Sequence, residues 1–135
     1  MESVLLVACD DHNQKMVLLV GVGQEEPMKW QSGRSKKERE TLIERMKKEA
    51  RRRGAGRIEF AYEASGQGYG FHDQLQAAGI RVHLLAPSKI RRSVSDQKGK
   101  TDGKDALLLY EVLRGHVLAG NRLPTVFIPD PGLRD

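Results

Sequence analysis

Apolar residues fall in short runs separated by polar turns, and this pattern predicts a set of strands near the start of the chain. Residues 4–9 form a continuous apolar run, which is typical of a central strand covered on both faces. The polar cluster at 10–13 predicts a turn, and the apolar run at 15–22 predicts a second strand that forms a hairpin with the first. We expect a short third strand over residues 27–32.

Residues 34–57 change to helical spacing. This segment holds eleven Lys or Arg residues against four Glu, which predicts a helix with a basic exterior. Gly54 and Gly56 are expected to end it. Its single apolar stripe consists of Leu42, Ile43, Met46 and Ala50.

Strand and helix patterns then alternate. Residues 57–62 predict a strand, and a glycine-rich connection at 64–70 leads into a helix that contains Leu75 and ends at Gly79. Residues 81–86 predict a further strand. Alternation along the first of these strands separates two sets of side chains, with Ile58, Phe60 and Tyr62 on one face and Glu59, Ala61 and Glu63 on the other.

A last helix is predicted from Thr101, a favourable N-cap residue. Asp102 and Asp105 are three residues apart and share one face of this helix. The same face continues through Leu109, Val112 and His116, which we interpret as a buried stripe. Two carboxylates at the end of an apolar stripe suggest a site, although acidic residues in a first turn also complement the helix dipole.

The order of elements predicts an α/β fold. A leading hairpin followed by alternating helices and strands indicates a mixed sheet with helices on both faces, the order found in ribonuclease H-like folds. A chain of 135 residues is expected to form one domain, here residues 1–120. Residues 121–135 contain several prolines and are expected to be an extended linker towards a further domain.

Charge favours a polyanionic partner. The net charge is +5 and the pI is about 9.5. A second basic segment at 87–104 is expected to be loose towards its end and to contact nucleic acid, although a solvated surface is the alternative for both basic segments. The candidate nucleic-acid-binding residues are Lys89, Arg91, Arg92, Lys98, Lys100 and Lys104.

Other features exclude several classes of protein. Cys9 is the only cysteine, which rules out an internal disulfide and a cysteine zinc cluster. No apolar run approaches the length that spans a bilayer, and the start lacks the basic region of a secretory signal. We therefore expect a cytoplasmic protein without a membrane partner.

Carboxylates follow the strands expected to lie at the centre of the sheet. Asp10 and Glu63 stand at the carboxyl ends of their strands, where ligands gather in open α/β sheets. If these strands are neighbours, Asp102 and Asp105 could complete a four-carboxylate cluster. Such a cluster suits one or two Mg²⁺ or Mn²⁺ ions, and two ions about 3.5–4 Å apart catalyse phosphodiester displacement. Asp11 and Glu59 are the alternative ligands.

Three motifs resemble a known family. They are Tyr-Glu-Ala-Ser-Gly-Gln-Gly-Tyr-Gly at 62–70, Leu-Gln-Ala-Ala-Gly-Ile at 75–80 with Leu-Ala-Pro at 85–87, and Lys-Thr-Asp-Gly-Lys-Asp-Ala at 100–106. In this order they resemble the N-terminal, RuvC-like domain of DEDD transposases of the IS-one-ten insertion-sequence family. The resemblance implies a ribonuclease H-like fold, metal-dependent DNA strand cleavage and exchange, and a catalytic and metal-binding tetrad. That tetrad would be Asp10, Glu63, Asp102 and Asp105.

The chain departs from the family pattern at its first motif. Family members usually have Gly-x-Asp before a histidine, whereas Ala-Cys-Asp-Asp-His stands here at residues 8–12. Asp10 keeps the spacing, but Asp11 is adjacent. Because side chains alternate along a strand, only one of the two should reach the site.

The resemblance also implies parts that are missing from this chain. Family members have a C-terminal domain with a nucleophilic serine, bind a structured guide RNA that bridges donor and target DNA, and are expected to form homo-oligomers at full length. We read Ser88, Ser93 and Ser95 as loop residues, so this chain should be a fragment that cannot complete recombination. Two alternatives are a freestanding RuvC-like nuclease or junction resolvase, and a non-catalytic nucleic-acid-binding module.

Overall fold

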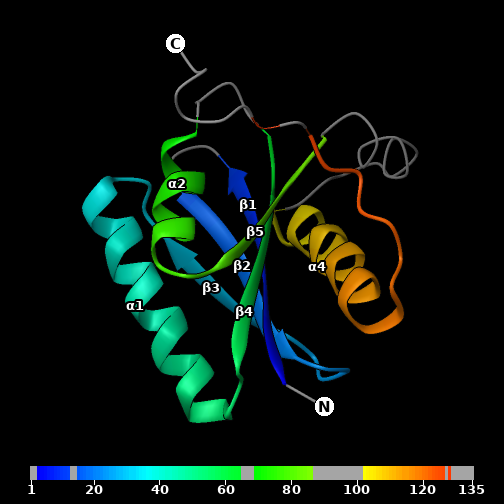
Figure 1. Cartoon of the computed structure of the whole chain (residues 1–135). Coiled ribbons are helices and arrows are strands. Elements are labelled where there is room, and N and C mark those ends of the chain that lie inside the picture. The colour runs from blue at the N-terminus through cyan, green and yellow to red at the C-terminus, as the bar shows by residue number, and fades with distance from the viewer. Residues whose placement is uncertain (1–2, 13–14, 65–68, 87–101, 127, 129–135) are drawn as a thin grey trace.

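The computed structural model describes residues 3–12, 15–64, 69–86, 102–126 and 128 as a mixed five-stranded sheet between helices (Figure 1). The strand order is β3-β2-β1-β4-β5. The predicted mixed α/β sheet with helices on both faces is confirmed. In chain order the elements are β1 (Val4–His12), β2 (Lys15–Val22), β3 (Met28–Ser32), α1 (Lys36–Arg53), β4 (Arg57–Glu63), α2 (Gly70–Ala77), β5 (Arg81–Leu85) and α4 (Asp102–Ala119).

The sheet changes direction at its centre. β1 pairs with β2 in antiparallel orientation, and β2 pairs with β3 likewise. On its other side β1 pairs with β4 in parallel orientation, and β4 pairs with β5 in parallel. The middle of β1 is buried on both faces of the sheet, which explains its uninterrupted apolar sequence.

The hairpin between β1 and β2 is longer than the sequence predicted. The polar residues expected to form a turn, from Asp10 onward, continue β1 to His12. Their ladder partners are in β2: Asp10 is opposite Val17, Asp11 opposite Met16, and His12 opposite Lys15. The turn prediction was wrong for these residues because pairing with an apolar strand outweighs the low strand propensity of aspartate.

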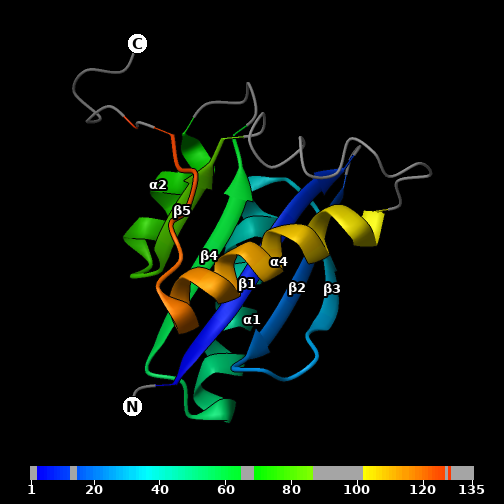
Figure 2. The same cartoon turned by 90° about the vertical axis from the view of Figure 1, so that its right-hand side faces the viewer.

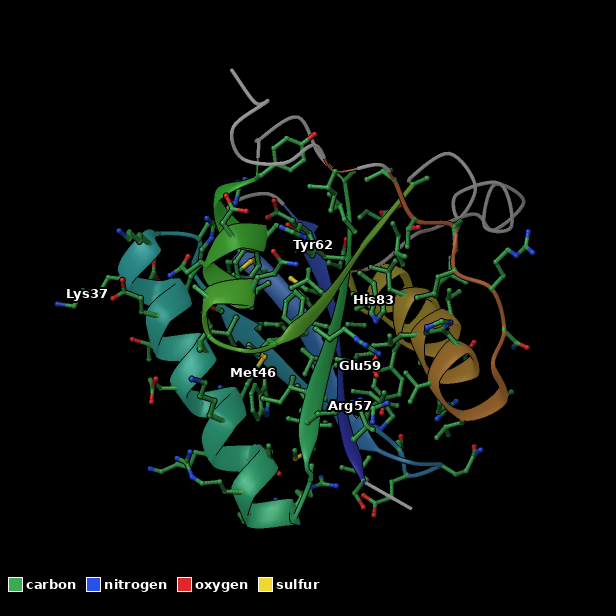
Figure 3. All side chains as sticks on the ribbon, viewed as in Figure 1. Lys37, Met46, Arg57, Glu59, Tyr62 and His83 are labelled. Carbon is green, nitrogen blue, oxygen red and sulfur yellow. The ribbon has the colours of Figure 1, made fainter. Side chains whose placement is uncertain are left out.

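Helices α1 and α2 cover one face of the sheet. The predicted stripe of α1 is buried there against Leu5, Val7 and Phe60, and Figure 3 shows Met46 directed towards the sheet and Lys37 away from it. A capping box starts α1: the Ser35 hydroxyl accepts from the backbone N–H of Glu38, whose carboxylate accepts from the Ser35 N–H.

Helix α4 covers the opposite face and crosses the sheet over β1 (Figure 2). Its buried stripe differs from the predicted one, because Val112 and His116 are only half-buried. The α4 residues that are buried against the sheet are Ala106, Leu109, Tyr110 and Leu113. The buried side of the helix is thus rotated from the predicted one, towards the residues that directly follow Asp105 and Val112. Among the helices of the described ranges, none is long and apolar enough to cross a membrane.

An extended segment after α4 borders β5. The Ala86 N–H donates to the Pro124 carbonyl at 2.7 Å, and the Val126 N–H donates to the Leu84 carbonyl at 3.0 Å. These bonds satisfy backbone groups that an edge strand would otherwise leave to solvent. The prediction that residues 121–135 link to another domain stays a prediction.

The contact between α4 and β2 gives a test of this packing. A Cβ added at Gly21 would stand 2.5 Å from the buried Tyr110 hydroxyl. Gly21→Ala should therefore lower the free energy of unfolding by about 1–3 kcal/mol through overpacking. Tyr110→Phe should be neutral or stabilising, since that buried hydroxyl has no hydrogen-bond partner among the described residues.

The double variant Gly21→Ala with Tyr110→Phe supplies the control. Removing the hydroxyl makes room for the new methyl group, so the double variant should be more stable than Gly21→Ala alone. Urea unfolding of all four proteins measures this coupling. Strictly additive effects would show that α4 does not lie against Gly21 as described.

Candidate functional site

Two of the predicted carboxylates lie side by side on neighbouring parallel strands. Cys9 of β1 is in register with Tyr62 of β4, and the next residues along the two strands are Asp10 and Glu63. Adjacent strands are about 4.8 Å apart, so the two backbones are close at this point. The sheet therefore brings Asp10 and Glu63 together where the parallel pairing of β1 with β4 ends, at the last residue of β4 and two residues before the end of β1.

Both carboxylates belong to the face that α4 covers. Alternation places Asp10 on the side of Ala8, and Glu63 on the side of Ala61; both alanines pack in the core beneath α4. Asp10 is 5% exposed and Glu63 is half-buried. One oxygen of each, Asp10 Oδ2 and Glu63 Oε2, is shielded from solvent. Buried carboxylates of this kind need a compensating positive charge.

Asp11 points to the other face and has a different role. Its carboxylate forms an ion pair with Arg34 at 3.0 Å, close to the start of α1. Cys9, on that same face, is buried, and burial first, then the nearby charges of Asp11 and Asp10, raises the pKa of its thiol. A thiol held protonated is a poor metal ligand. The alternation thus favours Asp10 over Asp11 as the candidate ligand.

The first turn of α4 lies at the same end of the sheet as the carboxyl end of β1 (Figures 1 and 2). Asp102 and Asp105 belong to this turn, and their side chains, like that of Lys104, lie outside the described residues. The other predicted nucleic-acid-binding residues also lie outside the described ranges: Lys89, Arg91, Arg92, Lys98 and Lys100. Their roles stay predictions.

A second polar cluster lies further down the same face. The Glu59 carboxylate contacts His83 Nε2 at 2.7 Å through Oε1 and Arg57 Nη2 at 2.8 Å through Oε2. Burial alone would raise the pKa of Glu59, but the hydrogen bonds from His83 and Arg57 outweigh it and hold the pKa below its usual range. Glu59 is therefore an ionised, almost fully buried carboxylate.

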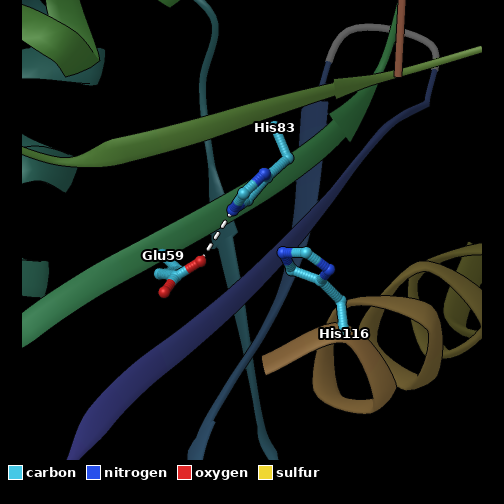
Figure 4. Close-up of side chains that lie close together, drawn as sticks. All are labelled: Glu59, His83 and His116. Atoms are coloured by element: carbon cyan, nitrogen blue, oxygen red, sulfur yellow. Dashed lines mark hydrogen bonds and ion pairs between the residues drawn. The ribbon is translucent and has the colours of Figure 1, made fainter. Parts of the chain in front are cut away.

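His116 of α4 completes this cluster, its ring 5.3 Å from that of His83 (Figure 4). Sequence reasoning assigned His116 to an apolar stripe and gave His83 no role. The sequence contained one signal of this cluster, because Glu59 places a charged residue in the middle of a predicted strand, on the face that it shares with Ala61. Its two histidine neighbours come from β5 and α4, and their proximity follows only from the tertiary fold.

Comparisons with known proteins support the fold and a partial sequence relationship. No family model matches the chain. The transposase for insertion sequence element IS1533 of Leptospira borgpetersenii is 42% identical over 57 residues, which are 42% of this chain and 16% of that protein. The putative transposase y4qE of Sinorhizobium fredii is 34% identical over 73 residues, 54% of this chain and 17% of that protein. The matched segments are thus about a sixth of these relatives.

Among solved structures, T. thermophilus RuvC in complex with a Holliday junction substrate is similar to this chain, with a TM-score of 0.53. The alignment covers 92% of this chain and 99% of that chain at 10% sequence identity. At this identity the likeness concerns the fold. The chain therefore has the ribonuclease H-like fold that its order of elements predicted, of the RuvC-like form that the motif resemblance implied. Part of its sequence is similar to two transposases, one of them from an insertion sequence element.

Proposed function

We propose that this chain is the metal-dependent catalytic domain of an insertion-sequence transposase that cleaves and exchanges DNA strands. The observation that carries the proposal is the placement of Asp10 and Glu63 in one row on neighbouring parallel strands, beneath the helix that begins at Asp102. The similarity of the chain to two transposases supports the same class of reaction.

The residues of the proposed site suit hard divalent cations. Asp10, Glu63, Asp102 and Asp105 offer only carboxylate oxygens, the ligands that Mg²⁺ and Mn²⁺ prefer. If the four groups converge, they would repel one another without a cation, so this assignment favours metal binding over a purely structural role. When bound, one or two ions would supply Lewis-acid stabilisation of the attacking and leaving oxygens at a phosphodiester.

The motifs extend the proposal to the IS-one-ten family of DEDD transposases. On this assignment the partners are DNA and a structured guide RNA, and the complete protein carries a C-terminal domain with a nucleophilic serine. Homo-oligomerisation belongs to that complete protein. The chain then supplies the four carboxylates and requires the second domain for full recombination.

Binding of metal can be tested by thermal melting in EDTA and in Mg²⁺ or Mn²⁺. A cation that binds only the folded chain should stabilise it by about 1.4 kcal/mol at a free concentration roughly ten times Kd. Asp102→Asn and Asp105→Asn should lose most of this gain. In EDTA they should be as stable as the parent or more stable, because carboxylate repulsion falls.

Asp11→Asn is the matched control for this experiment, because Asp11 pairs with Arg34 on the other face. It should keep the full metal response. If the parent melt ignores metal while both α4 variants melt lower in EDTA, the two aspartates serve as helix-dipole partners and the metal proposal fails.

A freestanding junction resolvase is the second candidate function. The structural likeness to a RuvC bound to a Holliday junction favours it. This chain alone, with Mn²⁺, would then cleave a four-way junction and leave a linear duplex of the same sequence intact. The transposase proposal expects no cleavage by the chain alone and strand exchange only in the complete protein. In either case, Asp10→Asn should abolish the reaction.

Phosphate contacts predict a steep salt dependence of nucleic-acid binding. Each neutralised phosphate contributes about −0.9 to the slope of log K against log salt on duplex DNA. Replacing Lys89, Arg91 and Arg92 by alanine should therefore reduce the slope by up to about 3, as measured by fluorescence anisotropy across a salt series.

The control variant removes the same charge from helix α1, at Lys36, Lys37 and Lys48, all exposed. Its slope should match that of the parent. A slope that falls only in the α1 variant would move the interface to that helix. Unchanged slopes in both would assign both basic segments to the solvated surface.

A further inference from the structure

The Glu59, His83 and His116 cluster has the composition of a metal site. The three side chains come from β4, β5 and α4, and one potential ligand atom from each lies within 4.8 Å of the other two. Figure 4 shows both imidazole rings and the carboxylate converging on one point between the sheet and the helix. None of the three is among the carboxylates of the proposed catalytic site.

The hydrogen bond of His116 fixes which ring nitrogen can bind an ion. His116 Nδ1 lies 2.7 Å from the backbone carbonyl oxygen of Asn121. A carbonyl only accepts, so Nδ1 carries the proton and Nε2 of the neutral ring keeps its lone pair. A histidine whose second nitrogen donates to a carbonyl is the usual arrangement in metal sites, since that bond orients the ring and strengthens it as a ligand.

Glu59 and His83 are held in place by their own contacts. Arg57 binds Oε2 of the Glu59 carboxylate through Nε at 2.9 Å and Nη2 at 2.8 Å, which leaves Oε1 facing His83. His83 Nε2 and Glu59 Oε1, at 2.7 Å, share a proton. A cation can replace that proton between the same two atoms, with His83 then protonated on Nδ1.

We propose that Glu59, His83 and His116 bind a borderline divalent transition metal, of which Zn²⁺ is the representative, with water as the fourth ligand. Two imidazoles and one carboxylate favour Zn²⁺ over Mg²⁺. Zinc–ligand bonds of about 2.0–2.1 Å place tetrahedral ligands about 3.3 Å apart. Small side-chain rotations bring the three ligand atoms from their present spacing to this one.

This site is separate from the carboxylates of the proposed function and does not rest on it. Glu59 precedes Glu63 by four residues on β4, a separation of roughly 13 Å along the strand. An ion here would tie β4 and β5 to the last turns of α4. It would thereby fix the helix whose first turn holds Asp102 and Asp105.

The test is a melt of the chain freed of metal in EDTA, dialysed, and titrated with Zn²⁺. At a free concentration roughly 100-fold above Kd, Zn²⁺ should raise Tm by about 5–10 °C. His116→Gln should abolish this rise, as should His83→Gln. In parallel, Co²⁺ added to the folded parent at room temperature should give the intense visible absorption of a tetrahedral site. This spectrum is measured on folded protein, so it reports metal binding even if the variants differ from the parent in stability.

The double variant Asp10→Asn with Glu63→Gln separates the two sites. It should keep the Zn²⁺ and Co²⁺ responses and lose the Mg²⁺ response. His116→Gln should lose the Zn²⁺ and Co²⁺ responses and keep the Mg²⁺ response. A Zn²⁺ response that disappears in the carboxylate variant and persists in His116→Gln would place the ion at the carboxylates and overturn the proposal. Absence of any Zn²⁺ or Co²⁺ response in the parent would show that the cluster is a hydrogen-bonded network only.

Discussion

The parallel pairing of β1 with β4 is the constraint on which the rest of the structure depends. It brings together two strands that are separated in sequence by β2, β3 and α1, and its register sets Asp10 beside Glu63. A shift of one residue would turn one of the two carboxylates to the α1 face, because side chains alternate along a strand. The two faces of β4 oppose that shift. Phe60 packs on the α1 face and the small Ala61 packs beneath α4, so a shift would exchange a large and a small side chain between the two cores.

Helix α4 depends on the same register, because its buried stripe packs against the β1 and β4 residues that precede the carboxylates. Ala106 and Leu109 hold the first half of the helix on the sheet, and Leu113 holds the second half. The helix is rigid, so contacts at one end influence the position of the other. His116, near its last turn, faces Glu59 and His83, while its first turn carries the remaining two proposed ligands. One helix therefore runs from the Glu59 cluster to the two proposed ligands in its first turn.

The sequence predicted what local pattern determines. The alternation in 57–63 gave both faces of β4 correctly, and the spacing of Leu42 and Met46 gave the buried side of α1. The predictions from sequence were wrong where the structure depends on contacts between elements that are distant in the sequence. Asp10 to His12 were read as a turn, because only the pairing with β2 makes them strand. The sequence pattern placed Val112 in the buried stripe of α4, whereas Leu113 is buried there, because the orientation of the helix against β1 determines which side faces the sheet. The Glu59 cluster joins three elements, and no spacing within one element reveals it.

The two polar clusters on the α4 face differ in a way that bears on their cations. Asp10 and Glu63 offer oxygen ligands at the open end of the sheet, where a substrate phosphate could approach. Glu59 and His83 lie beneath α4, and Glu59 is already neutralised by Arg57. That guanidinium opposes a second positive charge, so an ion there must be held by the imidazoles, which hard cations bind poorly. If both proposals hold, the chemistry of the ligands would direct Mg²⁺ or Mn²⁺ to the carboxylates and Zn²⁺ to the covered cluster, so the two kinds of ion would not compete for one site.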